Sequence, residues 1–143
     1  MVDVGESNRA DRAPVLPGMW VRALLPTAVL ACVSGRPLHG YAIAQALGTL
    51  GLGVPKGGSL YPALARLEED GALDAVWVPG PSGPARREYT LTTHGRERLE
   101  RERALLAMFT ARLDASAHRH DTAAQTSTVV VGDTTQEGGN DVR

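Results

Sequence analysis

Between residues 37 and 92 the sequence passes from helix-like to strand-like patterns, and this order restricts the fold more than any other feature. Two short amphipathic segments come first, and two β-prone runs follow, separated by the stretch PGPSGP. An order of helix, helix, strand, loop and strand is typical of a winged helix-turn-helix. We therefore predict a mainly α fold with a small β-hairpin (α+β), in which one short helix and one hairpin tip face the same surface.

Three helices are predicted before the hairpin. The first is apolar almost all round and should be buried on more than one side, although Pro26 must either start it or kink it. The second is ended by the glycines that follow it. The third has Ser59 as its N-cap and Pro62 in its first turn, where a missing N–H loses no bond. The predicted ranges are residues 18–34, 38–50 and 59–70.

A hairpin and a final helix complete the predicted fold. The β-prone runs cover residues 73–78 and 86–91. The final helix follows Thr92, whose hydroxyl can cap it, and continues to about Ala115. The chain is thus divided into a disordered tail (1–17), a winged helix-turn-helix domain (18–92), a dimerisation helix (93–115) and a second disordered tail (116–143).

Composition excludes several classes of protein. The single cysteine, Cys32, excludes an internal disulfide and fits a reducing cytoplasm, and its apolar neighbours indicate a small buried side chain. No run approaches the roughly 18 apolar residues of a membrane span. Only 4% of the residues are aromatic, so the core must be built from Leu, Ala and Val.

The net charge of −1 is unevenly distributed. Residues 18–115 hold 11 Lys and Arg against 9 Asp and Glu, a difference of +2, whereas residues 1–17 and 116–143 contribute −1 and −2. The predicted folded part is mildly basic and lacks a strong positive field. Binding to DNA would therefore depend on a few placed cations, with two copies of the site acting together.

The strongest candidate site combines the third helix with the hairpin. A helix that enters the major groove needs an N-terminal end free of bulk and rich in donors, which the KGGS run supplies. Tyr61 can donate to a phosphate, and Arg66 can reach a phosphate or a guanine edge. His39 is either a phosphate contact or a helix cap, and any single arginine could be an ordinary solvated charge. The candidate DNA-binding residues are His39, Lys56, Gly58, Ser59, Tyr61, Arg66, Arg86 and Arg87.

Two further sets of apolar residues are candidates for contacts between subunits, and the second of them allows two interpretations. Leu99, Leu106, Phe109 and Leu113 form a seam on the final helix, which Glu102 interrupts, so a regular coiled coil is not predicted. The second set either lines a pocket for a flat apolar ligand between subunits or packs in the core and the dimer interface. Its members are Trp20, Trp77, Met108 and Phe109.

The sequence contains no catalytic or metal-binding motif. There is no nucleophile elbow, no Walker loop and no dinucleotide-binding glycine pattern after a strand. His118 and His120 lie without cysteines or carboxylates at metal-ligand spacing. We therefore predict a protein that is not an enzyme and that has no cofactor and no metal site.

Three runs of the sequence resemble the PadR family of transcriptional regulators. They are PLHGYAIAQAL, GSLYPALARLEEDGAL and REYTLTTHGRERLE, within a match over about residues 18–113. The resemblance implies a winged helix-turn-helix whose final helix pairs with a second subunit, helped by the first helix. The short single final helix is similar to that of the smaller subgroup of the family.

Applied to this chain, the resemblance implies roles for individual residues. Ser59, Tyr61 and Pro62 would lie on the recognition helix, and Arg86 and Arg87 on the wing. Tyr41 matches the tyrosine of the family's second helix and joins the candidate DNA-binding residues. Help from the first helix adds two residues to the dimer interface, which then comprises Trp20, Leu24, Leu99, Leu106, Phe109 and Leu113.

The chain also departs from the family pattern. Glu88 stands where an aromatic residue is usual and Thr90 where a basic residue is usual, which weakens the positive charge of the wing. Pro26 interrupts a first helix that is often unbroken. The final helix carries no tryptophan, so the aromatic drug pocket of some members is not transferred. The candidate ligand pocket here is Trp20, Met108 and Phe109.

The function that these patterns predict is that of a cytoplasmic, homodimeric DNA-binding regulator. By resemblance it would repress its own or a neighbouring promoter at a pseudo-palindromic operator, with release by a small apolar effector. The alternative is a winged-helix module that binds protein and not DNA, which the small excess of positive charge and Glu88 favour.

Overall fold

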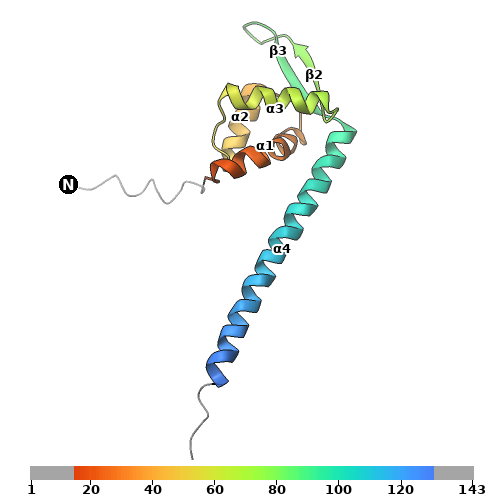
Figure 1. Cartoon of the computed structure of the whole chain (residues 1–143). Helices are drawn as coiled ribbons and strands as arrows, with labels where there is room; N and C mark the ends of the chain where they lie inside the picture. Colours follow the sequence, from red (N-terminus) through yellow and green to blue (C-terminus); the bar gives the residue numbers. More distant parts are fainter. Residues whose placement is uncertain (1–14, 131–143) are drawn as a thin grey trace, which may run out of the picture. The chain divides into compact units, whose positions relative to one another are not determined.

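The computed structural model describes residues 15–130 of the chain, and this part alternates helices with short strands (Figure 1). By contact, the chain divides into two compact units, residues 1–102 and residues 103–143. In chain order the elements are α1 (Gly18–Val33), β1 (Leu38–His39), α2 (Gly40–Thr49), α3 (Gly57–Glu69), β2 (Leu73–Val78), β3 (Arg86–Leu91) and α4 (Thr93–Val130). The predicted α+β winged helix-turn-helix is confirmed.

The core of the first unit is aliphatic, as the low aromatic content predicts. Leucine, isoleucine and valine side chains from all four helices and the sheet are removed from solvent, which is the main source of stability in a domain of this size. Tyr89 of β3 is also buried. The largest fully buried side chains are Val29, Leu30, Ile43, Leu47, Leu64, Leu67 and Leu73.

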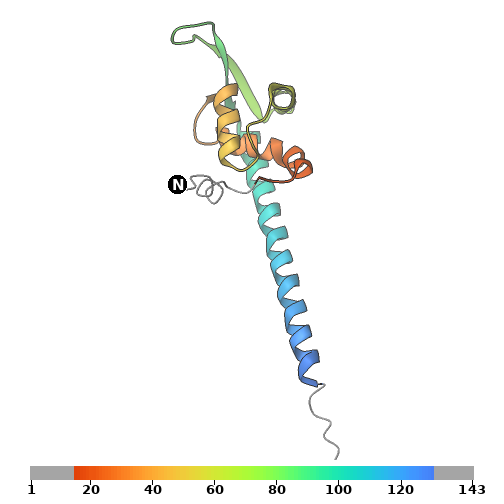
Figure 2. The same ribbon diagram turned by 90° about the vertical axis from the view of Figure 1, so that its left-hand side faces the viewer.

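The sheet has three antiparallel strands in the order β1-β3-β2. The hairpin of β2 and β3 was predicted, and its connecting loop extends away from the helices (Figure 2). The third strand was not predicted, since Leu38 and His39 were assigned to the second helix. Leu38 pairs instead with Tyr89 and His39 with Glu88, so α2 starts at Gly40.

The N-cap of α3 and the position of Pro62 differ from the predictions, and of the two alternatives for Pro26 the helix start is excluded. α1 continues through Pro26, although this residue has no N–H to donate to the carbonyl one turn earlier. α3 starts at Gly57 with Lys56 at the N-cap position, so the prediction of Ser59 as N-cap was wrong. The Ser59 hydroxyl donates to the Lys56 carbonyl at 3.0 Å, and Pro62 lies in the second turn.

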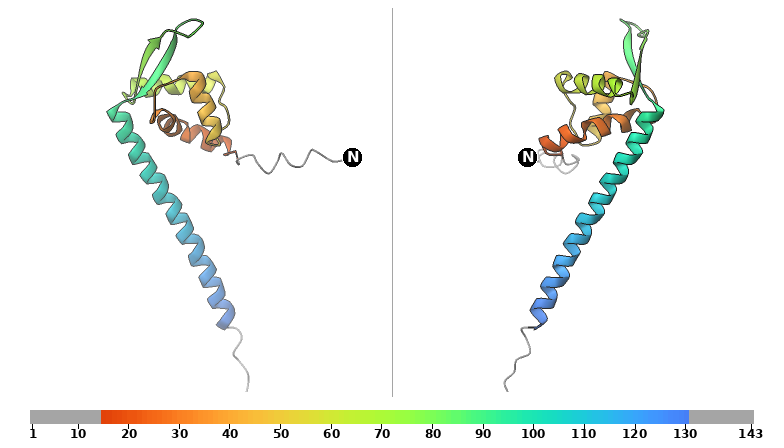
Figure 3. Two further views of the ribbon diagram at one scale, coloured as in Figure 1. Left: turned by 180° about the vertical axis from the view of Figure 1, so that it is seen from behind. Right: turned by 45° about the vertical axis from the view of Figure 1, so that its right-hand side comes forward.

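α4 begins directly after β3 (Figure 3), and polar contacts cap its start and join it to α1. The Thr92 hydroxyl accepts from the Gly95 N–H at 2.9 Å, which confirms the predicted cap. Glu102 accepts from the Thr27 hydroxyl of α1 at 2.6 Å and from Arg98 at 2.9 Å. Burial raises the pKa of Glu102, but these hydrogen bonds outweigh burial and hold the pKa below its usual value.

Beyond its first turns, α4 differs from the prediction in length and in one core residue. The helix continues to Val130, so its predicted end near Ala115 and the predicted disorder of residues 116–130 were wrong. The predicted disorder of residues 1–14 and 131–143 lies outside the described part of the chain. Leu99 was placed in the dimer seam, but its side chain is only 5% exposed within one chain and belongs to the core.

The described residues contain neither a candidate membrane-spanning helix nor a candidate metal site. Among residues 15–130, no helix is both long enough and apolar enough to span a membrane. The same residues contain no group of three or more His, Cys, Asp or Glu side chains that could hold a metal ion. Cys32 is half-buried, and burial raises the pKa of its thiol, so the thiol is less reactive than a free one.

Candidate nucleic-acid interface

A cleft of about 680 Å³ lies between α3, the start of α2 and the β2–β3 hairpin. We call it the wing cleft. It joins elements that are far apart in the sequence, and none of its nine described lining residues is acidic. Those residues are His39, Gly40, Tyr41, Tyr61, Ala65, Trp77, Arg86, Arg87 and Tyr89.

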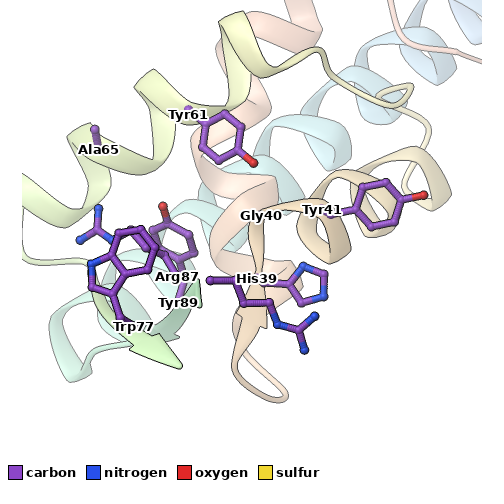
Figure 4. A pocket seen from close by; sticks show the side chains of 9 residues that line it. His39, Gly40, Tyr41, Tyr61, Ala65, Trp77, Arg87 and Tyr89 are labelled. Carbon is purple, nitrogen blue, oxygen red and sulfur yellow. The ribbon is translucent and has the colours of Figure 1, made fainter. Parts of the chain in front are cut away.

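Tyr61 and Gly40 bring α3 and α2 into close approach. Tyr61 extends from α3 toward Gly40 (Figure 4). A Cβ atom added at Gly40 would lie 3.0 Å from both the Tyr61 hydroxyl oxygen and its Cε1 atom. Tyr61 is a predicted DNA contact, and the structure adds that the space for its ring depends on the missing side chain of Gly40.

Arg87 is engaged inside the protein rather than free on the wing. Its Nη2 donates to Glu68 Oε1 at 2.8 Å, and its guanidinium carbon lies 5.8 Å from the ring centroids of both Trp77 and Tyr89. Figure 4 shows these two aromatic side chains beside Arg87. Its Nε is buried and has no hydrogen-bond partner within residues 15–130. The predicted DNA contact of Arg87 stays a prediction, and the structure adds that Arg87 links the hairpin to α3.

The other predicted cations remain available to a ligand. Lys56 at the N-cap position of α3, Arg66 on α3 and Arg86 on β3 are all exposed. In the described part of the chain, none of the three forms an ion pair. Gly58, Ser59 and Pro62 are also exposed on the first two turns of α3, so no bulky or acidic side chain covers them. These positions remain predictions of DNA contact.

His39 and Tyr41 take different positions at the start of α2. The His39 Nδ1 atom accepts from the Ala42 N–H at 3.3 Å, which makes His39 the N-cap, one of its two predicted roles. Tyr41 is 69% exposed, and its ring stacks with that of His39 at a centroid distance of 6.4 Å. Tyr41 lines the wing cleft, and in Figure 4 its hydroxyl points away from Tyr61 and Arg87.

Sequence reasoning did not place Trp77 in this site. It was weighed as a wall of a pocket between subunits or as packing in the core and the dimer interface, yet it is 69% exposed and pairs across the hairpin with Arg87. Because cross-strand partners lie on one face of a sheet, the alternation of Arg87, Tyr89 and Leu91 was the signal that could have found it.

The remaining predicted interface residues lie on α1 and α4. Leu24 is half-buried on α1, and Trp20 is exposed there. The α4 residues Leu106, Met108, Phe109 and Leu113 are exposed within the second unit. Their roles in a dimer interface or in a ligand pocket stay predictions.

Known proteins agree with this arrangement. The sequence model described as the transcriptional regulator PadR-like family matches residues 29–101. The chain is 39% identical over 89 residues to a 37.1 kDa protein in transposon TN4556 of Streptomyces fradiae, covering 62% of this chain but only about a quarter (25%) of that protein.

Two solved structures show the same architecture. A PadR family transcriptional regulator from Eggerthella lenta is 27% identical, with a TM-score of 0.56 over 66% of this chain and 79% of that one. A PadR-like transcriptional regulator from Bacillus cereus, at 23% identity, shares the fold with a TM-score of 0.63 over 69% of this chain and 96% of that one. The family consists of regulators and not of enzymes. With its winged helix-turn-helix, the chain belongs to the PadR-like family of transcriptional regulators.

Proposed function

We propose that the protein is a homodimeric, cytoplasmic repressor that binds double-stranded DNA at its own or a neighbouring promoter. The observation that carries the proposal is the wing cleft, where Tyr61 and Ala65 of α3 and the hairpin border one concave surface without an acidic lining residue. Three exposed cations, Lys56, Arg66 and Arg86, lie on the two elements that border it. Family membership supports a regulatory role.

In the proposed dimer, the two-fold axis determines the spacing of the two half-sites on the DNA. Two copies related by a two-fold axis present two α3 helices, and their half-sites should lie about one helical turn, ~10 base pairs, apart. The operator is then a pseudo-palindrome. A single copy, with its mild charge, would bind weakly.

The test is binding to the gene's own upstream region and to a scrambled duplex of equal length, measured by fluorescence anisotropy at several salt concentrations. Three cations in each of two protomers should give a slope of log K against log salt of about −5. A preference for the upstream region supports the proposal. A dimer that binds neither duplex at low salt would instead be the protein-binding module that the sequence left open.

Release by a small apolar effector completes the proposal. Trp20, Met108 and Phe109 are 54%, 43% and 59% exposed, and these are the candidate residues for an apolar ligand. A planar apolar compound that quenches Trp20 fluorescence in a Trp77→Phe variant, and that lowers DNA affinity, supports this part. Quenching without any loss of DNA affinity contradicts it.

A further inference from the structure

A second hollow lies on the other flank of α3, where α3 meets α1. It has a volume of about 320 Å³ and is separate from the wing cleft, with which it shares no lining residue. Figure 2, in which α3 (yellow-green) is seen nearly end-on, shows the hairpin and α1 on different sides of it. The hollow is lined by Arg22, Leu25, Pro26, Ser59, Pro62, Ala63 and Arg66.

Two arginines share this hollow without an acid to neutralise them. Arg22 of α1 and Arg66 of α3 are both exposed, and neither forms an ion pair among the residues the structure describes. None of the seven lining residues is acidic. Two like charges at one hollow repel each other, and an anion bound there converts this repulsion into attraction.

The position of the hollow fits the geometry of a DNA groove. A helix in the major groove has a sugar–phosphate strand on each side, and in helix-turn-helix proteins another helix crosses the backbone. The wing cleft lies on one flank of α3 and the arginine hollow on the other. We infer that Arg22, beside Arg66 and Ser59, binds a further backbone phosphate of the strand on the α1 side of the groove, in addition to the contact already counted for Arg66. This inference rests on the proposed function, because it assigns a second contact to the same bound DNA.

A phosphate contact has a signature that separates it from base recognition. It strengthens binding to every sequence alike and steepens the salt dependence by about one for each phosphate neutralised. With one such contact added in each protomer, the slope of about −5 given by three cations becomes about −7.

The experiment compares the full-length wild type with Arg22→Ala and Arg22→Lys. Anisotropy is measured on the upstream-region duplex and on the scrambled duplex at four salt concentrations. Arg96→Ala is the matched control, since Arg96 is an exposed arginine of α4 that lines neither hollow. Circular dichroism melting of each variant checks the fold, which the exposed position of Arg22 should leave unchanged.

Arg22→Ala should weaken binding to both duplexes by the same factor, on the order of tenfold, and bring the slope back to about −5. Arg22→Lys should retain most of the affinity, because the charge is kept. If Arg22→Ala matches Arg96→Ala while the wild type still prefers the upstream region, the inference fails and the proposed function stands. If the wild type binds both duplexes equally, the proposed promoter recognition fails, and the effect of Arg22→Ala on each duplex still decides the inference. Binding to neither duplex overturns both.

Discussion

Tyr61 and Gly40 meet where α2 approaches α3, and their contact sets the position of one wall of the wing cleft. A Cβ atom at position 40 would lie within 3.0 Å of the tyrosine ring. The ring is 55% exposed, so it can move away into solvent. A side chain at position 40 should therefore change the cleft more than it changes the stability of the protein.

Gly40→Ala should therefore lower DNA affinity while changing the unfolding free energy little. Thermal melting should show a change in unfolding free energy of no more than about 1 kcal/mol, since alanine's helix propensity opposes the displacement of the ring. DNA affinity in an anisotropy titration should fall several-fold. Gly18→Ala is the control, because Gly18 is likewise the first residue of a helix and has open space around it. Unchanged DNA affinity in Gly40→Ala would show that the position of Tyr61 has no part in binding.

At the scale of elements, the hairpin is joined to α3 by the Arg87–Glu68 ion pair. The side chains of Arg87 and Glu68 are 38% and 33% exposed, so this pair contributes at most about 1 kcal/mol to stability. We expect its larger effect to be on the angle between the hairpin and α3, which the pair joins. Arg86, one residue earlier on β3, keeps its charge free.

Arg86 and Arg87 should therefore respond differently to replacement by alanine. In the proposed dimer, Arg86→Ala should make the salt slope less steep by about 2, because each protomer loses one phosphate contact. Arg87→Ala and Glu68→Ala should weaken binding by similar factors with little change in slope, because both release the wing. Anisotropy over a range of salt concentrations measures the slopes. If Arg86→Ala and Arg87→Ala change the salt slope equally, Arg87 contacts a phosphate itself and does not act mainly by joining the hairpin to α3.

The contact between α1 and the start of α4 makes stability dependent on pH. The pKa of Glu102 is lowered in the folded state, so its contribution is present above its unfolded pKa and is lost as pH falls through the folded pKa. Between about pH 7 and about pH 3.5, the wild type should lose more stability than Glu102→Gln, measured by urea midpoints. Glu97→Gln, an exposed position on the same helix, is the control. Parallel losses in wild type and Glu102→Gln would remove Glu102 as the cause.

Local sequence patterns predicted those elements whose determining residues lie within the element or directly beside it. The amphipathic stripes predicted the bounds of α2 and α3 to within two residues, and Thr92, as a capping residue, predicted the start of α4. The short strand β1 exists only through its pairing with β3, which no local pattern contains. Likewise, the partner of Arg87 lies 19 residues away on α3, so its engagement could only be seen once the two elements had been brought together.

The length of α4 illustrates a different limit. Residues 116–130 include two Ser and three Thr, which are weak helix formers, and they belong to the Thr-, Gly- and Asp-rich stretch 116–143 that was predicted as disordered. They extend a helix that is already nucleated, and each added residue then needs only propagation. Thr122 and Thr126 also place their hydroxyls on carbonyls one turn earlier, at 3.0 and 2.9 Å. The hydroxyls thus bond within the helix rather than competing with it.

At the scale of the whole molecule, the proposed function requires two copies. The second unit has exposed apolar side chains on α4, including Leu106, Phe109 and Leu113. Phe109→Asp should therefore give a monomer at micromolar concentration, because a charge would have to be buried in the interface. Light scattering after size exclusion gives the mass. Ala111→Asp, on the opposite side of the same helix by its spacing, should remain a dimer. A wild type that is monomeric at micromolar concentration would refute the proposed assembly.

Gly40 and Gly95 differ in whether substitutions at these positions could be accepted during evolution. A side chain at Gly40 meets the end of a tyrosine, so a descendant could gain one there by shortening residue 61 at the same time. A side chain at Gly95 would overlap the carbonyl oxygen of Ala72, which every amino acid carries. No second substitution can remove a backbone carbonyl. Position 40 can therefore change together with residue 61, whereas position 95 must remain glycine as long as the backbone conformation is kept.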